Sequence, residues 1–380
     1  MSQDAEVLAR LMARRIRQDV QSVHAYAIQD SAGMVKLDAM ENPHRLSGPL
    51  QEELGRRLGS VALNRYPGDR VEDLRRALAA FAAIPADHEL MLGNGSDELI
   101  SLLATAYAAP LDPVTGSKPV VLAPEPGFVM YALSAQYQGL DFVGVPLRDD
   151  FTLDVKAMVD AIALHQPAIV YLAYPNNPTA NLWDEDAMAQ VIAAAAGVQS
   201  LVVIDEAYQP FSSKTYLDPM RAQPAQHAHV LLLRTLSKFG LAGVRIGYLC
   251  GRRELIAQID KLRPPYNISV LNAECALFAL EHADVFALQA QDIKAQRERL
   301  LQAFGHMAAV RPFPSDANMI LLRIQGQEDR ASAVFDALKA RGVLVKNVSK
   351  MHPLLRNCLR VTVGTASEND RLLTALQEIL

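Results

Sequence analysis

The stretch Arg234-Thr-Leu-Ser-Lys-Phe-Gly-Leu-Ala-Gly-Val-Arg245 follows an apolar run, Val230 to Leu233, that has the composition of a buried strand. Lys238 therefore lies just past a strand end, in a segment loosened by two glycines. Such a lysine suits Schiff-base chemistry when burial and nearby positive charge keep its amine neutral. Thr235, Ser237 and the closing arginine are donors of the types that hold phosphate. Taken alone, a lysine after a strand is most often a solvated surface residue, so the remaining chain must supply its partners.

The segment from residue 119 to residue 250 alternates apolar strands with helices. The predicted strands cover residues 120–123, 142–145, 168–173, 201–204, 230–233 and 246–250. Strands that are apolar throughout are typical of a parallel sheet buried on both faces, and ligands of such sheets bind beyond the carboxyl ends of the strands. Asn177, Asp205 and Lys238 each directly follow a strand, and Phe128 lies a few residues past one. Their shared placement predicts one site at this edge of the sheet.

A glycine turn, Gly93-Asn-Gly-Ser-Asp-Glu98, connects a short apolar strand to a helix predicted over residues 99–108. It is not a dinucleotide fingerprint, because Glu98 occupies the third glycine position, and the stretch contains no P-loop lysine. A helix start preceded by flexible backbone can nevertheless hold one phosphate through its N–H groups. A plain capped helix start is the simpler explanation of the motif in isolation.

The pattern changes after Pro264-Pro265, where a long helix is predicted over residues 269–304. Strands at 318–322, 343–346 and 358–365 and a helix at 331–341 follow, and an amphipathic helix is predicted at 5–18, near the N-terminus. We predict an α/β fold with a large domain, built on a mostly parallel sheet flanked by helices, and a smaller α+β domain. The predicted bounds are 1–44 for an N-terminal arm and part of the small domain, 45–265 for the large cofactor-binding domain and 266–380 for the small C-terminal domain.

Composition excludes several functions. A net charge of −5 and a pI near 6.0 argue against nucleic-acid binding. The sequence has no apolar run of the ~18 residues that a membrane span needs and no secretory signal at its start. Cys250, Cys275 and Cys358 are scattered and match no metal spacing, and His227 and His229 have no third ligand nearby. We therefore expect a cytoplasmic protein with reduced thiols and no metal.

Together the motifs resemble the fold-type I pyridoxal-phosphate aminotransferases along nearly the whole chain, and within them the histidinol-phosphate aminotransferases. The pairing of the Asn-Arg-Tyr-Pro and Leu-Arg-Val-Thr-Val-Gly-Thr stretches is the most particular part of the resemblance. Phe128 stands where a tyrosine is common, Ala180 replaces a glycine, and Lys346 lies where some members have arginine. The matching stretches are Asn64-Arg-Tyr-Pro67, Gly95-Ser-Asp-Glu98, Pro175-Asn-Asn-Pro-Thr179, Asp205-Glu-Ala-Tyr208, Arg234-Thr-Leu-Ser-Lys238 and Leu359-Arg-Val-Thr-Val-Gly-Thr365.

The resemblance implies a role for each polar residue at the strand ends. Lys238 would form the Schiff base with pyridoxal 5'-phosphate, Asp205 would face the ring nitrogen, and Tyr208 would complete the catalytic set. Tyr208 and Asn177 would donate to the phenolic oxygen of the cofactor, and Phe128 would stack on its ring. The expected cofactor-binding set is Ser96, Asp97, Phe128, Asn177, Asp205, Tyr208, Thr235, Ser237, Lys238 and Arg245.

The resemblance also implies the substrates and the assembly. The expected reaction converts L-histidinol phosphate and 2-oxoglutarate into imidazole-acetol phosphate and L-glutamate, a step of histidine biosynthesis. One site must accept a phosphate from one substrate and a carboxylate from the other, so it needs a shared anion receptor. The expected partner is a second copy of the chain, with Tyr66 reaching the neighbouring site. The expected substrate-binding residues are Tyr26, Tyr66, Asn177, Lys346 and Arg360.

Other functions stay open on the sequence. An aromatic aminotransferase or a phosphoamino-acid decarboxylase of similar sequence would share these motifs, and turnover of each amine would separate the three. A non-catalytic regulator that binds the same cofactor is a further reading. It would need an attached DNA-binding module, of which the sequence gives no sign, and the overall charge is unfavourable for DNA.

Overall fold

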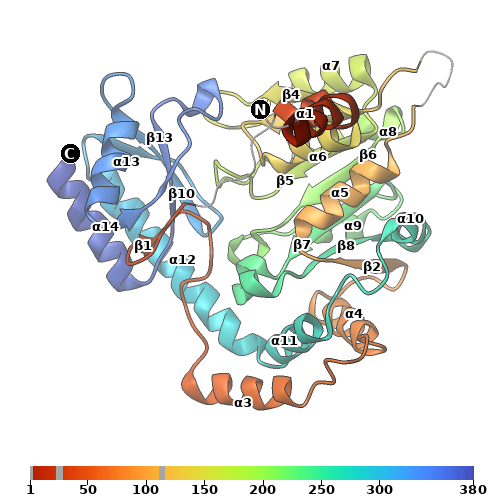
Figure 1. Ribbon diagram of the computed structural model, residues 1–380. Helices are drawn as coiled ribbons and strands as arrows, with labels where there is room; N and C mark the ends of the chain where they lie inside the picture. The colour runs from red at the N-terminus through yellow and green to blue at the C-terminus, as the bar shows by residue number, and fades with distance from the viewer. Residues whose placement is uncertain (1–2, 23–28, 111–115) are drawn as a thin grey trace.

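The computed structural model describes residues 3–22, 29–110 and 116–380, and these form two parts, each built around a sheet. Helix α12 (Ala283–Gly305) runs from the larger part into the smaller one (Figure 1). No helix within these ranges is both long enough and apolar enough to cross a membrane.

The larger sheet has seven strands within the described ranges, in the order β2-β8-β7-β6-β5-β3-β4. Neighbouring strands from β7 to β4 are parallel, whereas β8 is antiparallel to both β7 and β2. The predicted, mostly parallel α/β fold is therefore confirmed, and the strand predicted at 246–250 is its antiparallel member. The strands are β2 (His88–Gly93), β3 (Val120–Glu125), β4 (Asp141–Pro146), β5 (Ile169–Ala173), β6 (Leu201–Asp205), β7 (Val230–Thr235) and β8 (Gly247–Arg252).

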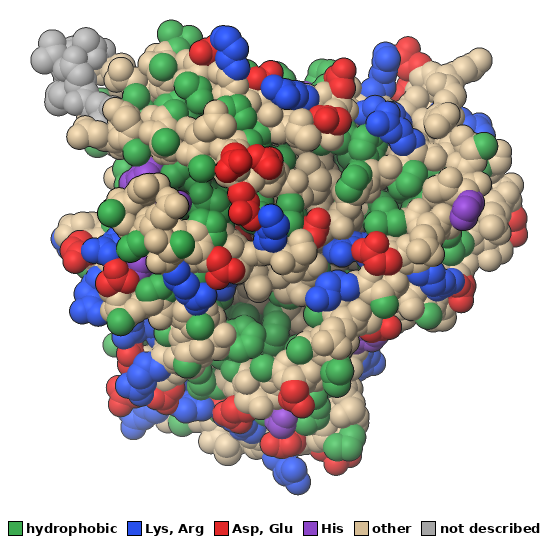
Figure 2. Space-filling view, turned by 180° about the vertical axis from the view of Figure 1, so that it is seen from behind, with side chains coloured by type: hydrophobic (Ala, Val, Ile, Leu, Met, Phe, Trp, Pro, Cys, Tyr) green, Lys and Arg blue, Asp and Glu red, His purple; other side chains and the backbone are tan. Residues whose placement is uncertain are grey.

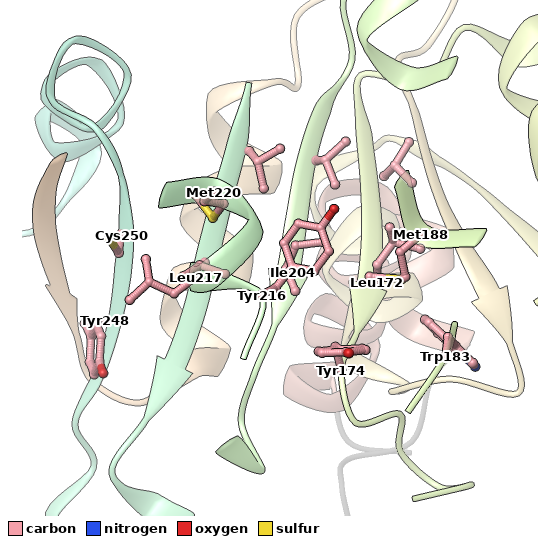
Figure 3. Packing of buried hydrophobic residues seen from close by; sticks show 14 of the residues in the cluster. Leu172, Tyr174, Trp183, Met188, Ile204, Tyr216, Leu217, Met220, Tyr248 and Cys250 are labelled. Carbon is pink, nitrogen blue, oxygen red and sulfur yellow. The ribbon is translucent and has the colours of Figure 1, made fainter. Parts of the chain in front are cut away.

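Helices cover both faces of this sheet, because successive side chains of a strand point to opposite faces and both sets are apolar. In β7, Leu231 and Leu233 pack toward one layer of helices and Leu232 toward the other. Figure 3 shows part of the core on the second side of the sheet, where Leu172 and Ile204 lie among other buried side chains of the same cluster. The first layer is α5 (Ser96–Ala106), α6 (Met130–Gln138) and α10 (Arg253–Ile259); the second is α4 (Arg70–Phe81), α7 (Val155–His165), α8 (Glu185–Gly197), α9 (Leu217–Ala222) and α11 (Val270–Glu281).

The smaller part contains an antiparallel sheet in the order β12-β13-β10-β9 and a parallel pair, β1 with β11. Because β1 (Val35–Lys36) pairs with β11 (Val343–Leu344), the N-terminal segment is held beside C-terminal strands. Apolar side chains from the helices and from β10 form the core of this part. The other elements are β9 (Val310–Pro312), β10 (Met319–Ile324), β12 (Lys346–Asn347), β13 (Cys358–Thr362), α13 (Arg330–Ala340) and α14 (Ala366–Ile379).

Two predicted helices are divided in the structure. The helix predicted over 269–304 is interrupted at His282, which gives α11 and α12. Helix α11 packs against α4 on the large sheet, while most buried residues of α12 lie in the small core, so different partners set the bend. The helix predicted over 5–18 is α1 (Gln3–Arg15) followed by the short α2 (Gln18–Ser22).

Three further helices also differ from the expectation. The helix predicted from residue 99 begins earlier, at Ser96, which brings the glycine turn directly onto its N-terminus. The sequence also predicts a short helix over residues 50–58, and α3 (Gly48–Gly59) is slightly longer than that, whereas no helix is predicted where α14 lies. A capping box formed by Thr365 and Glu368 starts α14. The predicted domain bounds at residues 44 and 265 stay a prediction.

Candidate active site

A cavity of about 350 Å³ opens beyond the carboxyl ends of β5, β6 and β7, next to the N-terminus of α5. Its wall comes from both parts of the chain, because Ala39, Met40 and Glu41 of the N-terminal segment close one side. Every residue of the expected cofactor set lines this cavity: Ser96, Asp97, Phe128, Asn177, Asp205, Tyr208, Thr235, Ser237, Lys238 and Arg245. The parallel strands therefore bring together side chains that are distant in sequence.

Lys238 lies in the tight turn Ser237–Leu241 directly after β7. Its Nζ donates a hydrogen bond to the carbonyl oxygen of Ala39 at 3.2 Å and lies 5.9 Å from the centre of the Tyr208 ring. Burial, and after it the positive charge of Arg360, lower the pKa of this amine to about 8. At neutral to slightly alkaline pH, a substantial fraction of the amine is therefore neutral and nucleophilic.

Asp205 is the last residue of β6, and its carboxylate is buried. The hydroxyl of Tyr131 donates to its Oδ2 at 2.7 Å, and the backbone N–H of Ala207 donates to its Oδ1 at 3.0 Å. Burial raises the pKa of Asp205 to about 6, while the hydrogen bond from Tyr131 opposes that rise. A cation placed against this carboxylate would keep it ionised.

Tyr131 is a site residue that the sequence did not indicate. It comes from α6, lines the cavity and stacks on Tyr171 with ring centroids 4.3 Å apart. The ring of Phe128 meets the ring of Tyr131 edge-on, with ring centroids 5.6 Å apart. The expected burial of Asp205 already implies that some group donates a hydrogen bond to its carboxylate. No sequence pattern indicates which helix supplies that donor.

The hydroxyl and guanidinium donors gather at the N-terminus of α5. Thr235 donates to Ser237 Oγ at 2.9 Å, and Arg245 Nη1 donates to the same atom at 3.4 Å. Arg245 Nη2 also pairs with Asp97 Oδ2 at 3.3 Å. Gly95, with φ of 80°, immediately precedes the helix, and a Cβ there would collide with Arg245. Backbone N–H groups, hydroxyls and a guanidinium around one point form a set suited to a phosphate group.

Arg360, from β13, is buried and contacts the site through Asn177. Its Nη1 donates to Asn177 Oδ1 at 2.8 Å, and its Nη2 donates to the carbonyl oxygen of Asp38 at 2.9 Å. Lys346 lies opposite Arg360 in the pairing of β12 with β13, but it does not line the cavity. Arg360 thus joins the small sheet, the N-terminal segment and the strand ends of the large sheet.

The two expected tyrosines differ in what the structure says of them. Tyr66 is 75% exposed, stacks on Tyr266 with ring centroids 4.1 Å apart, and lies outside the cavity wall of its own chain. Tyr26 lies outside the described residues. Glu41, which the sequence did not indicate, lines the cavity and forms an ion pair with Lys36. The described residues contain no group of three His, Cys, Asp or Glu side chains that could hold a metal.

The fold and the site define the class of protein. Residues 34–376 match the family model for aminotransferase class I and II, and the chain belongs to that family. It is 63% identical to the histidinol-phosphate aminotransferase of Polaromonas naphthalenivorans (strain CJ2), over 97% of each chain. It is 61% identical to that of Methylibium petroleiphilum (strain ATCC BAA-1232 / LMG 22953 / PM1), over 98% of this chain and 96% of the relative.

A solved structure has the same fold. The histidinol-phosphate aminotransferase of Sinorhizobium meliloti, in complex with pyridoxal-5'-phosphate, aligns with a TM-score of 0.82. The alignment covers 96% of this chain and 97% of that one at 23% identity. At this identity the likeness establishes the architecture alone, and the roles of individual residues rest on the geometry described above.

Proposed function

We propose that this chain is a pyridoxal-phosphate-dependent aminotransferase that converts L-histidinol phosphate and 2-oxoglutarate into imidazole-acetol phosphate and L-glutamate, in histidine biosynthesis. The observation that carries the proposal is one cavity holding a lysine of lowered pKa, a buried carboxylate and a phosphate-type donor set. The names of relatives that are 58–63% identical over nearly their whole length support the choice of substrate.

The residues of the cavity fit pyridoxal 5'-phosphate. Asp205 would hold the ring nitrogen, Phe128 would cover a ring face, and Asn177 and Tyr208 would bind the phenolic oxygen. When bound, the cofactor supplies an electrophilic carbon and a ring that withdraws electrons from the substrate. The residues for its phosphate are Ser96, Asp97, Thr235, Ser237 and Arg245. The buried carboxylate with a pKa raised to about 6 is an observation that asks for such a cationic partner.

Lys238 performs two tasks with the same atom. Its neutral Nζ would hold the cofactor covalently, and once a substrate amine has taken its place there, the freed amine would remove the proton from the amine-bearing carbon of the substrate. Burial serves both tasks, because an ammonium group could neither attack nor accept a proton. The hydrogen bond to the carbonyl of Ala39 fixes Nζ in the described state.

Substrate anions are assigned to Arg360, with Asn177 beside it. A buried guanidinium binds a phosphate or a carboxylate in the same bidentate way, so one residue can serve both half-reactions. Lys346, Tyr26 and Tyr66 are assigned as further contacts, the last from a second subunit. The proposed assembly is a cytoplasmic homodimer with shared active sites.

The test is a comparison of amine donors with the purified enzyme and 2-oxoglutarate. L-Histidinol phosphate, L-phenylalanine and L-threonine phosphate are supplied in turn, and L-glutamate is measured together with the fate of the donor. We expect glutamate to form in equal amount to the histidinol phosphate consumed, with kcat/KM at least about tenfold above either competitor, a barrier difference of about 1.4 kcal/mol. Faster turnover of phenylalanine, or loss of the donor without glutamate, would overturn the assignment.

A further inference from the structure

A second cavity, of about 600 Å³, lies where the turn after β4 meets the ends of β9 and β10. None of its lining residues lines the candidate active site. Its wall carries three arginines, Arg311, Arg323 and Arg356, together with Asp149 and Asp150. Within the part of the chain that the structure describes, none of these arginines forms an ion pair with a carboxylate.

Two of the arginines lie directly opposite each other. Arg311 of β9 pairs in register with Arg323 of β10, so both side chains leave the same face of the sheet. The guanidinium carbons lie 5.1 Å and 5.3 Å from the centre of the same ring, Phe313. Contact with an aromatic face orients and stabilises each cation, but it does not cancel the repulsion between them. An anion bound between the two guanidinium groups would cancel that repulsion.

The donors of these arginines are mostly unused. Arg323 Nη2 donates to the carbonyl oxygen of Leu354 at 2.6 Å, the same side chain contacts the Cys358 thiol, and its buried Nε makes no other hydrogen bond with a described residue. The side chains of Arg311 and Arg356, both exposed, donate to no described residue. Arg323 is therefore a fixed, half-buried charge, and its two neighbours supply free donors at the cavity surface.

We propose that this second cavity binds a small oxyanion, a phosphate or a carboxylate, with Arg311 and Arg356 as donors and Arg323 as the fixed central charge. Guanidinium forks match either group in a bidentate way. Asp149 and Asp150 lie on the same wall and form no ion pair with a described residue, so their charges oppose the anion and limit its affinity. The site is independent of the proposed transamination.

The chain provides its own reporter for this site. Trp183 is the single tryptophan, and its Nε1 donates to the carbonyl oxygen of Phe151 at 3.2 Å. Phe151 belongs to the turn after β4, and its ring lies 5.8 Å from the guanidinium carbon of Arg323. An anion that draws the arginines together shifts this turn, and the emission of Trp183 changes with it.

The experiment titrates the holoenzyme with inorganic phosphate and, in a separate arm, with acetate, at constant ionic strength held by chloride. Calorimetry and Trp183 emission are followed together. We expect saturable binding, and we expect the double variant Arg311→Gln/Arg356→Gln to raise the Kd at least tenfold. Asp149→Asn should lower the Kd severalfold, because it removes one of the two opposing charges. A response to phosphate alone identifies a phosphate ligand, and a response to both extends the site to carboxylates.

Two variants separate this site from other anion sites. Arg148→Gln removes an exposed arginine of the same turn that does not line the cavity, and Arg360→Ala removes the cation assigned to the active site. Both should keep the Kd of the emission change. An unchanged Kd in the double variant, a loss of the emission response in Arg360→Ala, or no heat and no emission change in the wild type would overturn the proposal.

Discussion

At the scale of single residues, burial acts in opposite directions on the pKa values of the two central ionisable groups. It lowers the pKa of Lys238 to about 8 and raises the pKa of Asp205 to about 6. In both cases the neutral form is favoured, because a charge is costly away from water. The surroundings then differ: Arg360 acts in the same direction as burial on Lys238, whereas Tyr131 opposes burial at Asp205. Each effect can be measured in the cofactor-free protein.

The first prediction concerns the pH dependence of Lys238 reactivity. In the cofactor-free enzyme, acetylation of Lys238 by limiting acetic anhydride should rise with pH through a midpoint near 8, because only the neutral amine reacts. The exposed Lys156, whose pKa is raised by its hydrogen bond to Asp160, serves as the control in the same digest and should titrate at much higher pH. Arg360→Met should move the midpoint of Lys238 upward. Equal midpoints for the two lysines, read by peptide mass, would contradict the assignment.

The second prediction concerns stability and Asp205. Its pKa of about 6 in the folded chain exceeds its ordinary value of 3.8, so the folded state binds more protons between these pH values. The contribution of Asp205 to the free energy of unfolding of the cofactor-free protein should therefore fall as pH rises from 4 to 6. Asp205→Asn lacks this loss, so its stability relative to the wild type should improve by about 2 kcal/mol between pH 4 and pH 6. Urea unfolding at each pH measures it, and parallel pH profiles for the two proteins would refute it.

Tyr131→Phe extends the same test. It removes the hydrogen bond that stabilises the charged carboxylate, so the pKa of Asp205 should rise further. The pH dependence of the unfolding free energy should then steepen, in the direction opposite to that of Asp205→Asn. A variant that is merely less stable at all pH values would indicate that Tyr131 acts only through packing.

At the scale of elements, the site depends on how closely β8 approaches the N-terminus of α5. A Cβ built on Gly247 would lie 2.7 Å from both Gly95 C and Ser96 N, which are backbone atoms that cannot move aside separately. Glycine at this position lets the helix start sit against the strand, which places its N–H groups at the cavity. Glycine is needed here for lack of space and not for its backbone conformation, because Gly247 does not have a positive φ.

The third prediction follows from this contact. Gly247→Ala should push α5 away from β8, lower the free energy of unfolding by about 1–3 kcal/mol and weaken binding of pyridoxal phosphate. Gly243→Ala is the matched control, since a Cβ there meets nothing within 4 Å although the residue lines the same cavity. Unfolding in urea and equilibrium binding of the cofactor measure the two effects. Equal behaviour of the two variants would exclude a role for the close approach.

At the scale of the whole molecule, the cavity joins both parts of the chain but does not include Tyr66. That side chain stacks on Tyr266 and remains 75% exposed, an unusual position for an aromatic pair. In the proposed homodimer, Tyr66 would reach the site of the second subunit. The aromatic pair would then be covered by the second chain.

The fourth prediction tests this sharing. Arg360→Ala and Tyr66→Phe should each reduce turnover strongly, and hybrids of the two variants should regain one active site of two. One site of the hybrid collects both lesions and the other has neither, provided that each site combines Arg360 of one chain with Tyr66 of the other. Differently tagged subunits allow hybrids to be purified and assayed. Hybrids no more active than their parents would show that Tyr66 acts within its own chain.

The sequence by itself determined the alternation of apolar strands and helices, the strand ends that carry Asp205 and Lys238, and the donors Thr235 and Ser237. These features depend on local spacing, because a strand that is buried on both faces must be apolar throughout and its polar residues begin where it ends.

Only the tertiary structure decided which distant groups meet at those strand ends. The hydroxyl of Tyr131 at Asp205, the carbonyl of Ala39 at Lys238 and the guanidinium of Arg360 at Asn177 come from different elements. The bend at His282 and the facing pair Arg311 and Arg323 are also tertiary features. Sequence periodicity reports which face of an element is buried. It does not report against which partner that face packs, and the charges and donors of that partner decide each pKa and each binding site.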